Sequence, residues 1–259
     1  RFKFIVLIFI LHKSIIVAQE LCPPIFAEAI FYDEKIDLCL VGEPTSYLKI
    51  GDSVRIGRRG SLGGRLKVLG KQGHIAYPEN VKNPIFSASD AIVELKNTVW
   101  DNGNAIFQPT SFQISNIHSG TGAKNVVPGE LEMFFNFRYS TESSQETLVN
   151  EFESILNKLE IEYEIDWKLS GLPYLTEENN LKDVVVQSVE KITGYSPDLN
   201  AKGGTSDGRF IAKMGTEIVE LGPLNETIHQ IDEHIKISEL CTLKNIYTDI
   251  LEGLNKKLA

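Results

Sequence analysis

The sequence contains little cysteine, and its three cysteines, Cys22, Cys39 and Cys241, are scattered along the chain. None of them has the C-x-x-C spacing that a zinc ribbon requires. An odd number of isolated cysteines is typical of a protein from a reducing compartment. We therefore expect a cytoplasmic protein without a cysteine-based zinc site.

The sequence also lacks an excess of positive charge and a long apolar run. Its formal net charge of -9 argues against nucleic acid as a partner. The apolar run at residues 4–11 is too short to span a bilayer, so no membrane partner is expected. That run predicts either a buried strand of a parallel sheet or the core of a signal peptide, with Ala18 near the cleavage position.

The composition is that of a globular protein, with 42% hydrophobic and 24% charged residues. A chain of 259 residues is long enough for one large domain or two modest ones. It has no internal repeat, no low-complexity tract and no nucleotide-binding glycine loop. The glycine-rich stretch at residues 57–64 interrupts the hydrophobic pattern, and we place a domain boundary there.

The hydrophobic pattern after this boundary predicts a strand, a helix, two strands, a helix and a strand, at residues 65–69, 84–97, 110–118, 131–139, 144–159 and 162–169. Asn83 and Pro84 are typical of a helix start, and Ser143 with Glu146 indicates a capping box at the second helix. The β-α-β-β-α-β order is that of the ferredoxin-like fold. Helices at 181–193, ended by Gly194, and 238–255 flank a strand at 216–221. The chain is thus predicted to be an α/β domain (residues 1–60 and 173–259) interrupted by an α+β domain (residues 61–172).

Several polar residues lie where chemistry is expected. Glu43 follows a buried strand, where open α/β sheets bind ligands, and is either a metal ligand or a solvated turn residue. His229 lies in a polar loop and is a second candidate metal ligand. The loop at 203–210 either binds an anion through backbone N–H groups and the Thr205 hydroxyl, or is a turn before a helix capped by Ser206 or Asp207.

The inserted domain and its boundary contribute five further candidates. His74 is either a surface histidine or a donor to a developing oxyanion, and Asn125 lies on a glycine-rich connection from which it could reach a substrate. Arg138 interrupts an apolar and aromatic strand, where an arginine usually pairs with a carboxylate of the protein or of a ligand. Arg58 and Arg59 form either a solvated basic turn or a carboxylate clamp.

Together these segments resemble the bacterial succinyl-diaminopimelate desuccinylases, members of the zinc-dependent aminoacylase and carboxypeptidase superfamily. The resemblance runs from about Glu34 to the C-terminus. It is carried, in this order, by IDLCLVGEPTS, GRRGSLGG, QGHIAYPENVKNP, GTGAKNVVPGELEMFFNFRYSTE, GGTSDGRFIAKMG and ELGPLNETIHQIDEHI. The combination is more specific than any of its parts.

The resemblance implies a catalytic α/β domain, with two zinc ions that cobalt can replace, and an inserted lid domain that forms a homodimer. It implies that Glu43 and His229 are zinc ligands and that His74 stabilises the oxyanion in the partner's site. The implied substrate-binding residues are Arg59, Asn125, Arg138, Thr205 and Asn225. The implied reaction is hydrolysis of N-succinyl-LL-2,6-diaminopimelate, a dicarboxylate amide, to succinate and LL-2,6-diaminopimelate in lysine and diaminopimelate biosynthesis.

Part of the family's site is missing from this chain. The family's zinc-binding H-x-D motif does not occur, and the only adjacent Glu-Glu pair, Glu177–Glu178, lies far from the expected place. The chain also begins with Arg1 rather than Met. We therefore expect a C-terminal portion that does not hydrolyse the substrate alone. Two alternatives are a related amidohydrolase, of acetylornithine deacetylase or dipeptidase type, and a noncatalytic dimerising remnant.

Overall fold

The computed structural model describes residues 4–7, 36–177 and 180–257, which form two compact units. Unit 1 comprises Arg1–Arg58 and Tyr174–Ala259, and unit 2 comprises Arg59–Pro173. The predictions made for Ala18, for Cys22 and for residues 8–11 of the apolar run lie outside the described residues.

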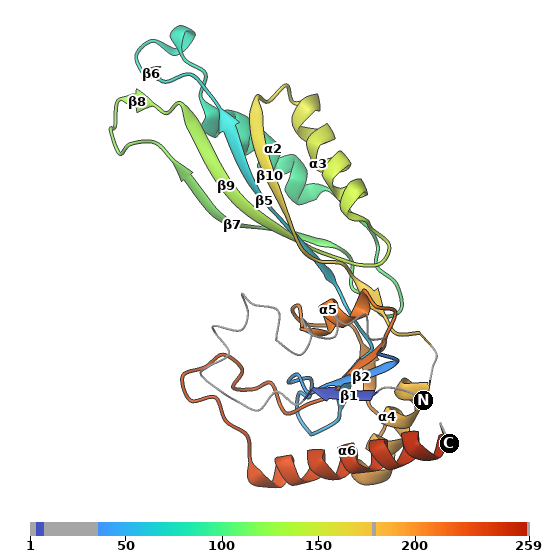
Figure 1. Ribbon diagram of the computed structural model, residues 1–259. Coiled ribbons are helices and arrows are strands. Elements are labelled where there is room, and N and C mark those ends of the chain that lie inside the picture. The colour runs from blue at the N-terminus through green and yellow to red at the C-terminus, as the bar shows by residue number, and fades with distance from the viewer. Residues whose placement is uncertain (1–3, 8–35, 178–179, 258–259) are drawn as a thin grey trace. The chain divides into compact units, whose positions relative to one another are not determined.

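Unit 1 is built on a five-stranded sheet (Figure 1). Its strands are, in spatial order, β1 (Phe4–Leu7), β2 (Leu38–Val41), β13 (Glu217–Glu220), β3 (Ser53–Arg55) and β12 (Asp198–Asn200). β1 and β13 both pair with β2 in parallel. All four residues of β2 are buried, because helices cover both faces of this sheet.

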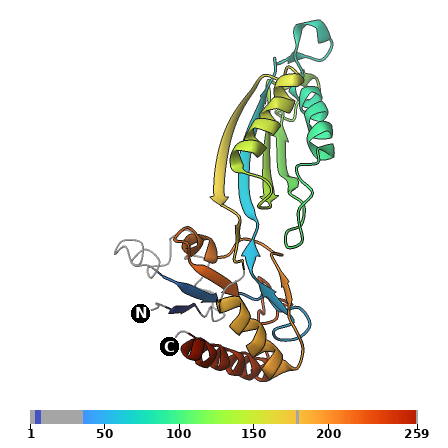
Figure 2. The same cartoon turned by 90° about the vertical axis from the view of Figure 1, so that its right-hand side faces the viewer.

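The helices of unit 1 lie on opposite faces of its sheet (Figures 1 and 2). α4 (Asn180–Thr193) and α6 (Ile237–Lys257) pack together on one face. The short α5 (Gly208–Ala212) covers the other face, where Ile211 packs against Cys39 of β2. A smaller pair of strands, β4 (Gly57–Arg58) and β11 (Tyr174–Leu175), lies where the chain leaves and re-enters the unit. The predicted α/β class is confirmed.

Unit 2 is a four-stranded antiparallel sheet with two helices on one face (Figure 1). The strand order is β10 (Tyr163–Gly171), β5 (Gly60–Leu69), β9 (Glu130–Tyr139) and β7 (Ser111–Ser119). α2 (Pro84–Asn97) and α3 (Gln145–Lys158) pack against this sheet and each other. The predicted β-α-β-β-α-β order is therefore confirmed. Two short strands, β6 (Gly73–His74) and β8 (Val126–Val127), and the 3₁₀ helix η2 (Pro78–Asn80) complete the unit.

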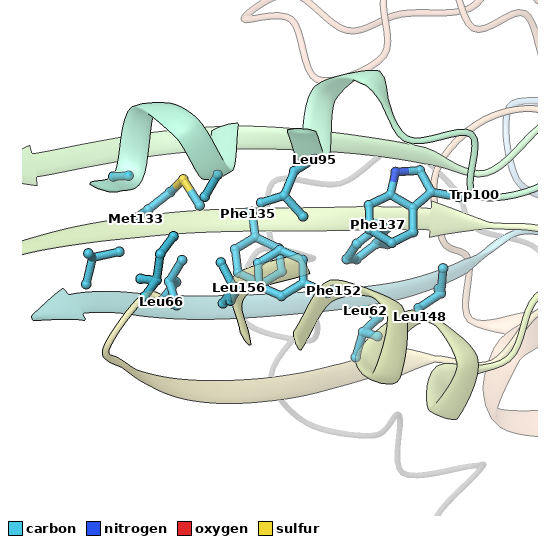
Figure 3. Close-up of a cluster of buried hydrophobic side chains, with 14 of the residues drawn as sticks. Leu62, Leu66, Leu95, Trp100, Met133, Phe135, Phe137, Leu148, Phe152 and Leu156 are labelled. Carbon is cyan, nitrogen blue, oxygen red and sulfur yellow. The ribbon is translucent and has the colours of Figure 1, made fainter. Parts of the chain in front are cut away.

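Aromatic side chains fill the space between the sheet and the helices of unit 2 (Figure 3). Phe135 of β9 stacks on Phe152 of α3, with ring centroids 4.6 Å apart. Trp100 meets Phe137 edge to face, also at 4.6 Å between centroids. Phe135 and Phe137 are alternate residues of β9, as expected for a strand with one face buried.

The boundary between the two units, after Arg58, lies inside the glycine-rich stretch, but the strand predicted to begin at Arg65 already begins at Gly60. A β-carbon at Gly60 would lie 2.3 Å from the Tyr139 ring, and one at Gly64 would lie 2.2 Å from the Phe135 ring. Both rings belong to the neighbouring strand β9. The glycines therefore make room for aromatic rings inside a continuous strand.

The predicted start of α2 is confirmed, with Asn83 accepting a hydrogen bond from the Ile85 N–H. The predicted capping box of α3 is wrong by one residue, because Ser144 caps the helix, in partnership with Thr147. The Ser143 hydroxyl is engaged elsewhere, since it donates to Asp101 at 2.6 Å.

Asp101 collects hydrogen bonds from residues around the start of β7 and just after the end of β9. Its carboxylate accepts from the backbone N–H groups of Gly103 and Thr110 and from the hydroxyls of Thr110, Ser140 and Ser143. We call these five residues the Asp101 network. Burial acts to raise the pKa of Asp101, but the hydrogen bonds outweigh it and lower the pKa to about 2.

Candidate active site

Two loops of unit 1 that carry predicted site residues run side by side. The Ser46 N–H donates to the Pro223 carbonyl at 3.1 Å, and the Asn225 N–H donates to the Ser46 carbonyl at 2.9 Å. A β-carbon at Gly222 would lie 2.2 Å from the Glu43 carbonyl oxygen, so only glycine allows the loops to approach this closely. The structure thus brings the backbone at Glu43 next to the loop that contains Asn225.

Glu43 is a half-buried carboxylate just beyond β2. Burial raises its pKa to about 7, the charge of Glu220 adds to this effect, and Arg58 opposes it. Within the described ranges it forms no ion pair. A bound cation would replace the solvation that this carboxylate has lost, so Glu43 fits the role of a metal ligand.

His229 is exposed and has a backbone φ of 61°, a conformation that is uncommon outside glycine. Strained backbone of this kind is concentrated at functional sites. Nevertheless, no group of three or more histidine, cysteine, aspartate or glutamate side chains that could hold a metal occurs in the described part of the chain. Glu43 and His229 therefore remain two candidate ligands of a site that needs others.

The loop at residues 202–206 contains Thr205, whose side chain is half-buried. Within the described residues the Thr205 hydroxyl makes no hydrogen bond, so it is free to meet a ligand. Asp207 is the N-cap residue of α5, although its side chain forms no capping hydrogen bond. Gly203 has a φ of 98°, and a β-carbon there would lie 2.7 Å from the Arg58 guanidinium. The loop is therefore wrapped closely around Arg58.

A buried glutamate at the end of β13, Glu220, organises this region and was missed by the sequence patterns. It is 1% exposed and pairs with Arg58, which donates to it through Nε at 2.9 Å and through Nη2. The Tyr174 hydroxyl donates to its other oxygen at 2.6 Å, and so does the Ser206 hydroxyl. We call these four residues the Glu220 network. A glutamate inside an apolar strand was the available signal, since such a charge needs partners.

Arg58 was predicted to be a solvated basic residue or a carboxylate clamp, and its burial contradicts the first interpretation. Its guanidinium binds Glu220, and its Nη1 also donates to the carbonyls of Lys202 and Gly204 at 3.1 and 3.2 Å. Because all three nitrogens of this guanidinium already donate hydrogen bonds to protein oxygens, few of its five N–H groups are left for a ligand. In this structure Arg58 clamps a carboxylate of the protein.

In unit 2 the structure brings His74 and Asn125 together from β6 and the loop before β8. Nδ1 of His74 accepts a hydrogen bond from the Ala76 N–H at 3.1 Å, so the neutral ring carries its proton on Nε2. The Asn125 amide nitrogen lies 3.5 Å from that Nε2. Both side chains are exposed, so a ligand oxygen could accept hydrogen bonds from them.

Arg59 and Arg138 form a second positively charged group in unit 2. Burial lowers the pKa of Arg59, and the charge of Arg138 lowers it further. Arg59 Nε and Arg138 Nη1 are buried without a hydrogen-bond partner, and neither side chain pairs with a carboxylate of the described residues. Such a pair is suited to bind an anionic group of a ligand.

Known proteins resemble this chain in sequence, one family model over residues 56–164 and several curated proteins over 222 residues. Residues 56–164 match the family model of a peptidase dimerisation domain. The succinyl-diaminopimelate desuccinylase of Methylococcus capsulatus is 52% identical over 222 residues, which is 86% of this chain and 59% of that protein. The desuccinylase of Acinetobacter baumannii is 56% identical over the same shares. Over these residues the chain is similar in sequence to the desuccinylases. It spans about three-fifths of the length of these curated relatives.

Solved structures resemble the same region in fold. An aminopeptidase from Bacillus cereus superposes with a TM-score of 0.72 at 21% identity, covering 85% of this chain and 58% of that one. An M20 family metallo-carboxypeptidase from Sulfolobus solfataricus gives a TM-score of 0.70 at 16% identity, with 89% and 66% coverage. The matched part of the chain thus shares the fold of these two structures. None of its described helices combines the length and apolarity that crossing a bilayer requires.

Proposed function

We propose that this chain is part of a metal-dependent amidohydrolase that converts N-succinyl-LL-2,6-diaminopimelate to succinate and LL-2,6-diaminopimelate. The observation that carries the proposal is the 52–56% identity to desuccinylases over 86% of the chain. The chemistry of Glu43 in unit 1 and of His74, Asn125, Arg59 and Arg138 in unit 2 supports it, because a dicarboxylate amide offers both anionic ends and a carbonyl oxygen to such groups.

Glu43 and His229 are the residues of this chain that would hold the metal. Zinc, with cobalt as a substitute, is the proposed ion, and when bound it would polarise the amide carbonyl and lower the pKa of a water molecule. His74 and Asn125 would donate hydrogen bonds to the developing oxyanion, His74 in the partner subunit's site. Thr205, Asn225, Arg59 and Arg138 would hold the carboxylates of the substrate.

A chimera tests this function directly. The part of the Methylococcus capsulatus desuccinylase that lies outside the match would be fused to this chain and assayed with zinc. We expect hydrolysis of N-succinyl-LL-2,6-diaminopimelate in preference to N-acetylornithine and dipeptides, and no turnover by the isolated chain. The same chimera with His229→Ala is the matched control and should lose activity by several orders of magnitude. A chimera that prefers N-acetylornithine or a dipeptide would assign a different amidohydrolase specificity.

A noncatalytic dimerising remnant is the second candidate, and it is favoured by the observation that the described residues include no cluster of three or more metal-ligating side chains. The zinc content of the chimera distinguishes the two. A remnant would bind no zinc even in the chimera, whereas the proposed enzyme would bind it there and lose it with Glu43→Ala.

We also propose that the chain forms a homodimer through unit 2. β7 is an edge strand, and the neighbouring α2 exposes Phe86 and Val93 at 71% and 59% of their surface. Exposed apolar side chains beside an open sheet edge are typical of a protein interface. Sedimentation equilibrium should give a dimer, and Phe86→Asp should shift it to a monomer. The cytoplasmic location stays a prediction from the cysteine pattern.

A further inference from the structure

In the loop at residues 202–206, the residues on both sides of Thr205 are held by hydrogen bonds that lead to one carboxylate, that of Glu220. Before Thr205, the carbonyls of Lys202 and Gly204 accept hydrogen bonds from Arg58, which is itself held by Glu220. After Thr205, the Ser206 hydroxyl donates to Glu220. The loop residue between these attachments is the one whose hydroxyl has no hydrogen-bond partner among the described residues.

We propose that Glu220 is a positioning residue that holds the 202–206 loop in the conformation in which Thr205 binds the substrate's anionic group. Glu220 does not touch the ligand itself, because it is 1% exposed and its two oxygens accept four hydrogen bonds from Arg58, Tyr174 and Ser206. The proposal rests on the proposed function, which gives the loop an anionic ligand.

The physical reason lies in how the loop is built. Gly203 has a φ of 98° and packs against Arg58, and Gly204 has no atom within 4 Å of the position of a β-carbon, so little packing other than that against Arg58 defines their conformation. Such residues lose much conformational entropy when they are ordered, and hydrogen bonds at both ends must compensate. Without the charge of Glu220, Arg58 would have no carboxylate partner and would lose its fixed position under the loop.

Two measurements on the 259-residue chain test this proposal. The first is hydrogen exchange of residues 203–206, compared with exchange of β2, in Glu220→Gln. We expect the loop amides to exchange at least tenfold faster, beyond any change in β2. Thr216→Val is the matched control, because Thr216 precedes the same strand and its buried hydroxyl bonds to the Ile36 carbonyl, away from the loop. Thr216→Val should change the exchange rates of the loop and of β2 by the same factor.

The second measurement is the affinity for succinate, used as a dicarboxylate probe. Glu220→Gln should weaken binding about tenfold, and Thr216→Val should not. If the unaltered chain binds no succinate, the anion-binding role of the loop in the proposed function is wrong, while the exchange result still decides the role of Glu220. Equal acceleration of the loop and β2 in Glu220→Gln would overturn the proposal.

If Glu220→Gln does not fold, Tyr174→Phe replaces it. This variant removes one hydroxyl donor to Glu220 and leaves the Arg58 pair in place. It should accelerate loop exchange by a smaller factor, still without acceleration of β2. A Tyr174→Phe variant whose loop exchanges like the unaltered chain would overturn the proposal in the same way.

Discussion

Each unit of the molecule centres a polar network on one carboxylate, but the two carboxylates are satisfied differently. Glu220 in unit 1 is fully buried and shares its charge with the guanidinium of Arg58. Asp101 in unit 2 is half-buried and accepts only neutral donors, from backbone N–H groups and hydroxyls. A carboxylate without access to water needs a cation, whereas one at the rim of the protein can keep its charge with neutral hydrogen bonds.

The largest effect is expected from Glu220→Ala, which leaves the buried Arg58 without a counter-charge. Removing one partner of a buried ion pair costs about 3–5 kcal/mol of unfolding free energy. Hydrogen exchange of β2 and β13 would measure the loss in unit 1. If a double variant, Glu220→Ala with Arg58→Ala, is no more stable than Glu220→Ala, the unpaired guanidinium is not the cause.

A smaller loss is expected from Asp101→Ala, because water can approach the donors that it leaves unpaired. We expect the free energy of unfolding to fall by about 2–3 kcal/mol. Both tryptophans, Trp100 and Trp167, belong to unit 2, so their fluorescence follows this unit during denaturation. Asp166→Ala, at an exposed position of β10, is the control and should leave the midpoint unchanged.

A still smaller loss of stability is expected when acid protonates Asp101. The pKa of Asp101 is lowered to about 2 from an ordinary value of 3.8. Its stabilising contribution is therefore complete above pH 4 and is lost as the pH falls toward 2, by an amount on the order of 1 kcal/mol after solvent screening. Urea midpoints from tryptophan fluorescence between pH 2 and 5 should show this slope, and Asp101→Asn should flatten it.

The smallest effect is expected where an ion pair is exposed. Arg65 and Glu132 pair across β5 and β9 on the solvent face of unit 2, with 49% and 24% of their side chains exposed. Exposed pairs of this kind contribute little, because water solvates both charges. Arg65→Ala should leave the urea midpoint within experimental error. A shift comparable to that of Asp101→Ala would contradict the comparison between buried and exposed carboxylates.

The parts of the fold that the sequence predicts well are those with local determinants. Asn83 and Pro84 specify the start of α2, and Gly194, with a φ of 81°, follows the end of α4. The cap of α3 was misassigned because Ser143 and Ser144 are equivalent locally. Only the distant Asp101 decides which hydroxyl remains for the helix.

A candidate site residue could be predicted where it stands out in its own segment. A contact between residues that are remote in sequence could not. His74 and Asn125 were chosen separately, and the structure places them 3.5 Å apart. Arg58 and Glu220 are 162 residues apart in sequence, and no local pattern shows that they pair. The roles of Glu43, Arg59, Arg138, Thr205, Asn225 and His229 stay predictions, since contacts with a ligand define them.

The glycines under the rings of β9 also have a consequence for folding. Gly60 and Gly64 lie opposite Tyr139 and Phe135, and both pairs are four residues apart along their strands. Shifting β5 by two residues would set Phe135 against Leu62 or Leu66, where a side chain already occupies the space of the ring. A shift by four would place one of the two rings opposite a glycine and the other opposite a residue with a side chain. The spacing therefore disfavours misaligned pairing of β5 with β9 while the domain assembles, before any ligand or partner can select the correct register.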